Sequence, residues 1–170
     1  GIVTSTSTNS GTTSATVSIV LSTSLSQGAT TLVANTTDPT GVSVSAASSS
    51  LVITVDTTAP SAPTLALQTD TGLSTTDKIT SNGLVNITGL ETGDKWQYSI
   101  NGSTYDAGTT LSGGATAATL AASLFSQGSN TVTILETDVA GNTVTNSFTY
   151  TLDTVAPSLS SITVNGANLV

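Results

Sequence analysis

Short runs of alternating apolar and polar residues, separated by turn-forming residues, recur along this chain. The clearest run, NTVTNSFTYTLD at 142–153, places Val144, Phe148, Tyr150 and Leu152 on one face of a strand. We therefore expect a strand that is buried on one side, as in a sheet that covers a hydrophobic core.

The same alternation predicts further strands at 84–90, 95–101 and 130–138. Asn101-Gly102 is the strongest hairpin signal, because this pair tolerates the positive φ angles of a tight turn. The stretch 115–125 has a helix-compatible spacing, and we expect a strand followed by a helical turn there. Together these runs predict an all-β fold, with antiparallel sheets packed as a β-sandwich.

The only tryptophan, Trp96, lies in the middle of one predicted strand. We expect it to pack between the two sheets and not to bind a ligand. Because side chains alternate along a strand, Lys95 should then point to the opposite face. This placement argues against a buried lysine cross-link at Lys95.

Several short motifs occur twice, in the same order. SQG at 26–28 returns as SQG at 126–128, and DTTAP at 56–60 returns as DTVAP at 153–157. The offsets are 100 and 97 positions, so the first copy carries three extra residues. We interpret this as a tandem repeat of roughly 97–100 residues, and we call the two pentapeptides the seams.

The seams divide the chain into three predicted parts. Residues 1–56 correspond to the C-terminal part of a repeat, 57–157 to a complete repeat, and 158–170 to the opening strands of a following one. The strands predicted in the complete repeat form the pattern of a β-sandwich, so the expected fold class is a tandem array of antiparallel sandwich repeats.

The composition excludes several classes of function. The chain has no His and no Cys, so it lacks the usual nucleophilic triads and the ligands that zinc prefers. Two cationic residues and a net charge of −8 argue against nucleic-acid binding and against docking on anionic membranes. No apolar run is long enough to insert into a membrane. Carboxylates such as Glu91, Asp94 and Glu136 could in principle form a hydrolase-like pair, but we expect no enzyme.

Four motifs, in order, resemble the bacterial Ig-like repeats of giant RTX-type adhesins and biofilm surface proteins. They are DTTAPSAPTLAL at 56–67, DTGLSTTDKITSNG at 70–83, VNITGLETGDKWQYSING at 85–102 and TDVAGN at 137–142. The chain departs from these relatives where they carry D-G-G after the Trp strand, since INGSTY stands there.

The resemblance implies calcium ions at or near the seams. Ca²⁺ binds oxygen ligands, and acidic residues lie at the seams and in loops that fit this expectation. The candidate ligands are Asp56, Asp70, Asp77, Asp138 and Asp153. The alternative is that these carboxylates keep a Lys-poor surface soluble and accept hydrogen bonds from turns.

The predicted function is a non-catalytic structural spacer of an extracellular bacterial adhesin or surface filament. Its expected partners are neighbouring Ig-like domains of the same polypeptide or filament. One alternative is a self-assembling fibre protomer whose incomplete ends complement neighbouring chains by strand exchange, giving a homopolymer. The other is a ligand-binding adhesion module, for which Tyr98 and Tyr105 are the only support.

Overall fold

The computed structural model describes residues 24–36, 45, 47–110 and 115–160. The chain forms two compact units, Gly1–Thr58 and Ala59–Val170, and each is considered by itself. The predicted opening strands at 158–170 fall largely outside the described residues, and 158–160 carry no strand.

In the first unit the described strands form one antiparallel hairpin. β1 (Gly28–Leu32) pairs with β2 (Leu51–Val55), with Gly28 opposite Val55 and Leu32 opposite Leu51. Two bonds between Ala34 and Ser48 continue the pairing beyond the strands, through Ser48 N to Ala34 O at 2.7 Å and Ala34 N to Ser48 Oγ at 3.0 Å. None of the described residues in this unit is buried.

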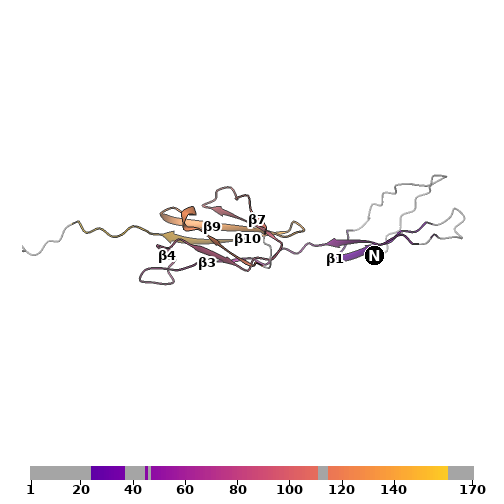
Figure 1. The fold of residues 1–170 in the computed structure, drawn as a ribbon, viewed down its shortest axis with the longest axis horizontal. Helices are drawn as coiled ribbons and strands as arrows, with labels where there is room; N and C mark the ends of the chain where they lie inside the picture. Colours follow the sequence, from indigo (N-terminus) through magenta and orange to yellow (C-terminus); the bar gives the residue numbers. More distant parts are fainter. Residues whose placement is uncertain (1–23, 37–44, 46, 111–114, 161–170) are drawn as a thin grey trace, which may run out of the picture. The chain divides into compact units, whose positions relative to one another are not determined.

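The second unit contains two sheets that pack face to face (Figure 1). The smaller sheet has the order β3-β5-β8, and the larger sheet has the order β4-β10-β9-β6-β7. The strands are β3 (Thr64–Leu67), β4 (Ile79–Thr80), β5 (Val85–Thr88), β6 (Lys95–Ile100), β7 (Thr109–Thr110), β8 (Ala117–Leu120), β9 (Gly128–Thr137) and β10 (Thr143–Leu152). All neighbours are antiparallel except β4 and β10, which are parallel. The predicted sandwich of antiparallel sheets is therefore confirmed.

Apolar side chains from both sheets meet in a single core. The smaller sheet contributes Val85 and Ile87 of β5, and the larger sheet contributes Val132 and Ile134 of β9, all fully buried. Along β9 the burial alternates strictly, as expected for a strand with one face on the core. Phe125 and Tyr150 complete this core with an edge-to-face contact, with ring centroids 5.4 Å apart.

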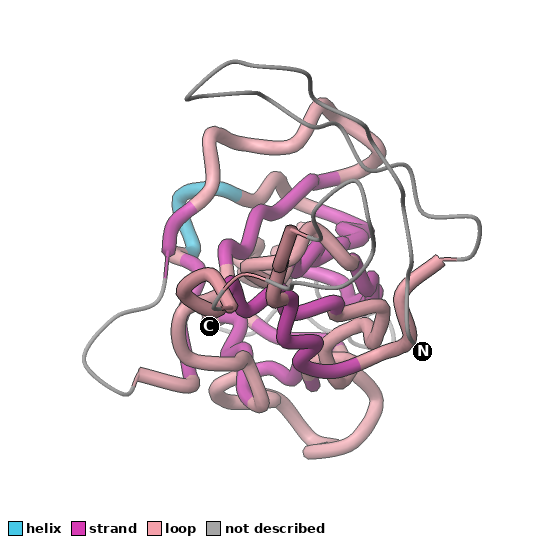
Figure 2. Tube along the Cα trace, turned by 90° about the vertical axis from the view of Figure 1, so that its right-hand side faces the viewer, coloured by secondary structure: helices cyan, strands magenta, loops and turns pink. Residues whose placement is uncertain are grey.

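Several local predictions are confirmed. A 3₁₀ turn, η1 (Ala122–Leu124), follows β8 and is drawn in cyan in Figure 2. Trp96 is buried while Lys95 is exposed. Asn101 and Gly102 have φ angles of 52° and 75° and form the predicted turn, closed by Ser103 N donating to Ile100 O at 3.0 Å.

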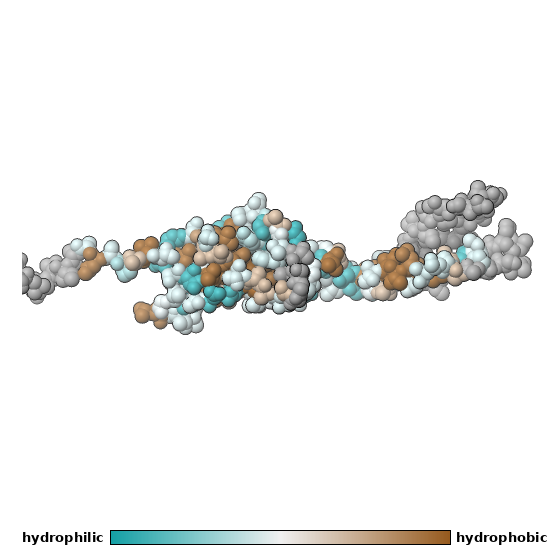
Figure 3. Space-filling model, in the orientation of Figure 1, coloured by the Kyte–Doolittle hydropathy of each residue, from teal (hydrophilic) through white to brown (hydrophobic). Residues whose placement is uncertain are grey.

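The outward face of β9 and β10 carries pairs of hydroxyl side chains. Thr131 and Thr149 lie opposite each other with their oxygens 2.9 Å apart, and Thr133 and Ser147 repeat this contact at 2.9 Å. Much of the surface seen in Figure 3 is pale, the colour of residues of intermediate hydropathy such as Thr and Ser. Some of the many Thr and Ser residues thus form cross-strand pairs on the exposed face of a sheet.

Candidate functional site

The repeated SQG and D-T-x-A-P motifs meet in the structure. Gln127, directly before β9, donates from Nε2 to Asp153 Oδ1 at 2.9 Å. Its Oε1 accepts from both the backbone nitrogen and the hydroxyl of Thr154, each at 3.0 Å. Asp153 Oδ1 also accepts from Val155 N at 3.0 Å, which forms an Asx turn. We call this arrangement of Gln, Asp and Thr the glutamine clamp.

The first unit contains the same glutamine clamp. Gln27 Nε2 lies 2.9 Å from Asp56 Oδ1, and Gln27 Oε1 accepts from the nitrogen and the hydroxyl of Thr57, each at 2.7 Å. Asp56 Oδ1 accepts from Thr58 N at 3.0 Å. The clamp therefore recurs atom for atom, which explains why the two motifs repeat together.

The geometry of the surrounding hairpin explains how each glutamine reaches its seam. The glutamine precedes the first strand of an antiparallel hairpin and the seam follows the second strand, so the two lie side by side. Glycine follows each glutamine, and Gly28 and Gly128 have φ angles of 102° and 95°, a region that favours glycine. In the second unit, buried Asn130 adds three bonds to Ser126 and Gly128 that shape this turn.

The second unit also holds the chain just after the first seam. Ser61 N donates to Glu91 Oε1 at 2.8 Å, and Asn146 Nδ2 donates to Pro63 O at 2.8 Å. Pro60 and Pro63 are both buried. We call this set of contacts at 60–63 the proline anchor.

The five predicted calcium ligands fall in three places. Asp56 belongs to the first unit, and Asp138 follows β9 of the second. Asp70 and Asp77 precede β4, whose partner is the last part of β10, so they share the end of the unit where Asp153 lies. Asp70 Oδ2 accepts from Lys78 N and Asp77 Oδ1 accepts from Ile79 N, each at 3.0 Å.

The carboxylate of Asp138 accepts hydrogen bonds from its own turn. Its Oδ1 accepts from the nitrogens of Ala140 and Asn142, and its Oδ2 accepts from Asn142 Nδ2, each at 2.8 Å. These bonds, the Asn142 side chain first, hold the pKa of Asp138 below its usual value.

The five predicted carboxylates take part in the hydrogen bonding of their own loops. Each of the five carboxylates already accepts a hydrogen bond from its own turn or loop. Within the described ranges, no group of three or more acidic side chains is arranged to hold a metal ion. Calcium at these residues stays a prediction.

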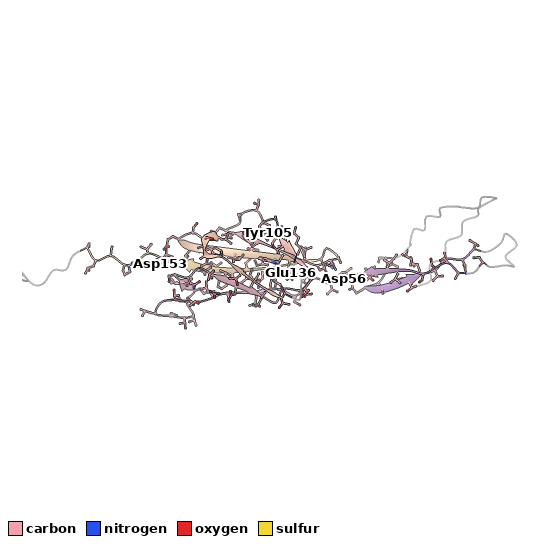
Figure 4. The ribbon with its side chains drawn as sticks, in the orientation of Figure 1. Asp56, Tyr105, Glu136 and Asp153 are labelled. Atoms are coloured by element: carbon pink, nitrogen blue, oxygen red, sulfur yellow. The ribbon has the colours of Figure 1, made fainter. Side chains whose placement is uncertain are left out.

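The structure reveals a pair of buried carboxylates that the sequence pattern did not single out as ligands. Glu136 is 0% exposed and Asp94 is 6% exposed, and we call them the acidic pair. Glu136 Oε1 accepts from Glu91 N at 2.6 Å, which draws the loop before β6 against the end of β9. Figure 4 labels Glu136, which lies toward the opposite end of the second unit from Asp153. Strict alternation along β9, which puts residue 136 on the core side, was the signal that could have found it.

Burial and the surrounding negative charges disfavour ionisation of the acidic pair. Burial raises the pKa of Asp94, and the negative charges of Glu91 and Asp138 raise it further. Burial also raises the pKa of Glu136; the bond from the Glu91 amide opposes this shift, and the charges of Asp94 and Glu91 add to it. Asp94 Oδ2 and Glu136 Oε2 are buried and accept no hydrogen bond.

The residues considered for the other predicted activities lie in different surroundings. Glu91 is exposed and accepts a hydrogen bond from Ser61 N, whereas Asp94 is buried. Tyr98 is half-buried and packs against the core, and Tyr105 is 39% exposed in the loop before β7 (Figure 4). Among the described residues, no helix has the length and apolarity needed to cross a membrane.

Comparison with known proteins agrees with this architecture. No curated protein matches the chain. A family model described as a bacterial Ig-like domain matches residues 58–154, more than half of the chain. Such domains are structural and surface modules that are generally non-catalytic and commonly extracellular. The matched residues contain both sheets of the second unit, and the chain therefore belongs to the bacterial Ig-like domain family.

Proposed function

We propose that this chain is a non-catalytic spacer segment of an extracellular bacterial adhesin or surface filament, of the RTX-type class that it resembles. The observation that carries this proposal is the tethering of the chain on both sides of the first seam. The glutamine clamp holds 56–58 within the first unit, and the proline anchor holds 60–63 within the second. A spacer has to hold successive domains at a fixed spacing. A linker that is bonded to the domains on both sides serves that purpose.

The physical argument concerns the freedom of the linker. A flexible linker is rich in Gly and Ser and has no bonds to the domains it joins. Here Thr57 and Thr58 donate their backbone nitrogens within one unit, and Ser61 donates its nitrogen within the other. Pro60 further restricts its own φ and the conformation of Ala59. Few dihedral angles remain free, so we expect a stiff joint.

Calcium at the seams belongs to the same proposal, because the resemblance implies it. An ion at Asp56 or Asp153 would act on a joint that the clamp already restrains. We therefore expect most of the stiffness to persist in chelator, with any calcium effect added to it.

Small-angle scattering tests the stiffness. We compare the chain with the double variant Gln27→Ala/Glu91→Ala, which removes side-chain bonds on both sides of the seam. The control is Gln68→Ala, which removes an exposed glutamine outside both sets of contacts. We expect a broader distribution of dimensions for the double variant only. Equal distributions for all three proteins would contradict the stiff-joint proposal.

Assembly with neighbouring copies is the second candidate function, and one observation favours it. Leu51 and Val52 of β2 are 59% and 57% exposed, whereas the equivalent strand of the second unit contributes to the core. Partner strands could cover these residues in a homopolymer. Sedimentation over a range of concentrations separates the candidates, because an isolated spacer segment stays monomeric.

A further inference from the structure

We propose that Asn101 is a site of spontaneous covalent modification, and that the fold directs this reaction to Asn101 and away from Asn82. Both residues precede a glycine, whose lack of a side chain leaves its nitrogen open to react with the neighbouring asparagine side chain. A third Asn-Gly pair, at 165–166, lies outside the described residues. The proposal does not depend on the spacer role.

The reaction needs only the chain itself and water. The nitrogen of Gly102 forms a bond to Cγ of Asn101, and the side-chain amide leaves as ammonia with the proton that the nitrogen loses. The product is a cyclic succinimide. Water then opens the ring at either carbonyl: one opening gives aspartate, and the other gives isoaspartate, in which the main chain runs through the former side chain. No group is oxidised or reduced, and the chain gains a negative charge.

The first argument is the difference in space around the two glycines. Gly102 is exposed, and a Cβ placed on it would meet no atom within 4 Å. Gly83 is buried, and a Cβ placed on it would lie 3.2 Å from both Ala122 Cβ and Leu152 Cδ1. Ring closure has to move the peptide unit between asparagine and glycine, so the reaction is free at the turn and obstructed beside the core.

The second argument is the hydrogen bonding of each pair. Among the described residues, no protein group accepts a hydrogen bond from Gly102 N, so this nitrogen is open to solvent. The other pair is held on both sides. Asn82 N donates to the hydroxyl of buried Thr80 at 3.1 Å. The hydroxyl of buried Tyr150 donates to Gly83 O at 3.3 Å. These bonds oppose the rearrangement that ring closure requires at Asn82.

The third argument is the surroundings of the reacting carbonyl. Thr131 N donates to Asn101 Oδ1 at 2.7 Å. Attack at Cγ places negative charge on this oxygen, and a fixed backbone N–H directed at it stabilises that charge. Leu84 N is a comparable donor to Asn82 Oδ1, at 3.0 Å. Both carbonyls are therefore activated, and access to the glycine nitrogen separates the two pairs.

The product changes the turn at the end of β6. Asn101 N donates to Thr131 O at 2.8 Å, so residue 101 bonds to β9 through both its main chain and its side chain. Isoaspartate adds a methylene to the main chain of this tight turn, so the bond from Ser103 N to Ile100 O cannot keep its geometry. We expect faster hydrogen exchange at Thr131 and Ser103 in the modified chain.

Peptide mapping by mass spectrometry tests the site in the unaltered full chain. The folded chain is kept at mildly alkaline pH, and a parallel sample is kept in urea. Heavy-oxygen water, present only during this incubation, marks each residue that is converted before the digest. Trypsin cleaves after lysine, so cleavage at Lys95 places Asn82 and Asn101 in different peptides. Fragmentation then assigns each change in mass to a single residue.

Asn82 serves as the matched control within the same chain. In the folded chain we expect Asn101 to convert at least about tenfold faster than Asn82, because the buried pair reacts only after local opening. In urea we expect the two residues to convert at similar rates. Equal rates in the folded chain, the same ratio of rates in urea, or an Asn101 that stays unmodified while the urea sample converts would each overturn the proposal. The scattering test of the spacer role uses fresh protein and is unaffected by any of these results.

Discussion

Gln127 Oε1 accepts hydrogen bonds from both the backbone nitrogen and the hydroxyl of Thr154, each at 3.0 Å. One glutamine side chain thus binds the main chain and the side chain of the same residue. Gln27 and Thr57 repeat the contact at 2.7 Å in the first unit. Since the bonded residues closely follow the last described strand of each unit, we expect the clamp to restrain the direction in which the chain leaves that strand.

Replacing Gln127 by Ala should release the seam without unfolding the unit. Thr154 N loses its acceptor and Asp153 loses a donor, but both are exposed and can bond to water. We expect a loss of about 1 kcal/mol in the free energy of unfolding. Hydrogen exchange should show faster exchange at Thr154 and Val155. Gln68→Ala is the control, and unchanged exchange in Gln127→Ala would show that the clamp does not restrain the seam.

Asn130 should contribute more to the free energy of unfolding than Gln127 does, because Asn130 is fully buried. Its side chain bonds Ser126 N, Ser126 O and Gly128 O at 3.2, 2.7 and 2.9 Å. Asn130→Ala leaves these groups without partners, and we expect a loss of about 2 kcal/mol in the free energy of unfolding. Urea unfolding measures it, with the exposed Asn35→Ala as reference. Equal midpoints for the two variants would contradict this role.

Two isoleucines provide a matched test of the core. Ile87 of β5 is fully buried, whereas Ile79 of β4 is 46% exposed. Ile87→Ala removes apolar contacts and leaves a cavity, so we expect a loss of about 2–5 kcal/mol in the free energy of unfolding. Ile79→Ala should cost clearly less. Denaturant titration compares the free energies of unfolding of the two variants. A similar loss in both would contradict the position of Ile87 in the core.

Tyr150 should make the second unit sensitive to alkali. Its hydroxyl donates to Gly83 O at 3.3 Å, and burial raises its pKa to about 12. Because the unfolded chain ionises at the ordinary value near 10, the stabilisation by neutral Tyr150 is complete below about pH 10 and is lost as the pH rises to about 12.

Absorbance titration of the folded chain should show one tyrosine ionising near pH 12. Tyr150→Phe should lack this transition and should lose less stability between about pH 10 and 12. Titration of all tyrosines together at the ordinary value would contradict the buried position of Tyr150.

Much of the fold was readable from local patterns. Alternation located β6, β9 and β10, and the turn at Asn101-Gly102 followed from a pair that accepts positive φ. The repeat also survives in three dimensions: Gly28 opposite Val55 corresponds to Gly128 opposite Leu152, with the three extra residues absorbed between the strands. These features depend on neighbouring residues along the chain, so a single sequence can reveal them.

The surroundings of the candidate site residues could not be predicted. Asp138 was chosen because it is an acidic residue beside a turn, and its oxygens prove to be used by that turn. Glu136 was considered only as a carboxylate for a hydrolase-like pair, and its complete burial was not predicted. The residue type alone does not show whether an acidic residue lies in a loop or in a core, and at position 136 only the alternation along β9 carried that information.

The sequence by itself determined the strand pattern, the period of the repeat and the identity of the repeated motifs, because these depend on residue type and spacing. Only the tertiary structure decided that Gln127 bonds the seam 26 residues away, and that Asp94 and Glu136 share a buried end of the sandwich. The physical reason is that strand pairing brings distant segments together, and burial then sets the charge and bonding of each carboxylate.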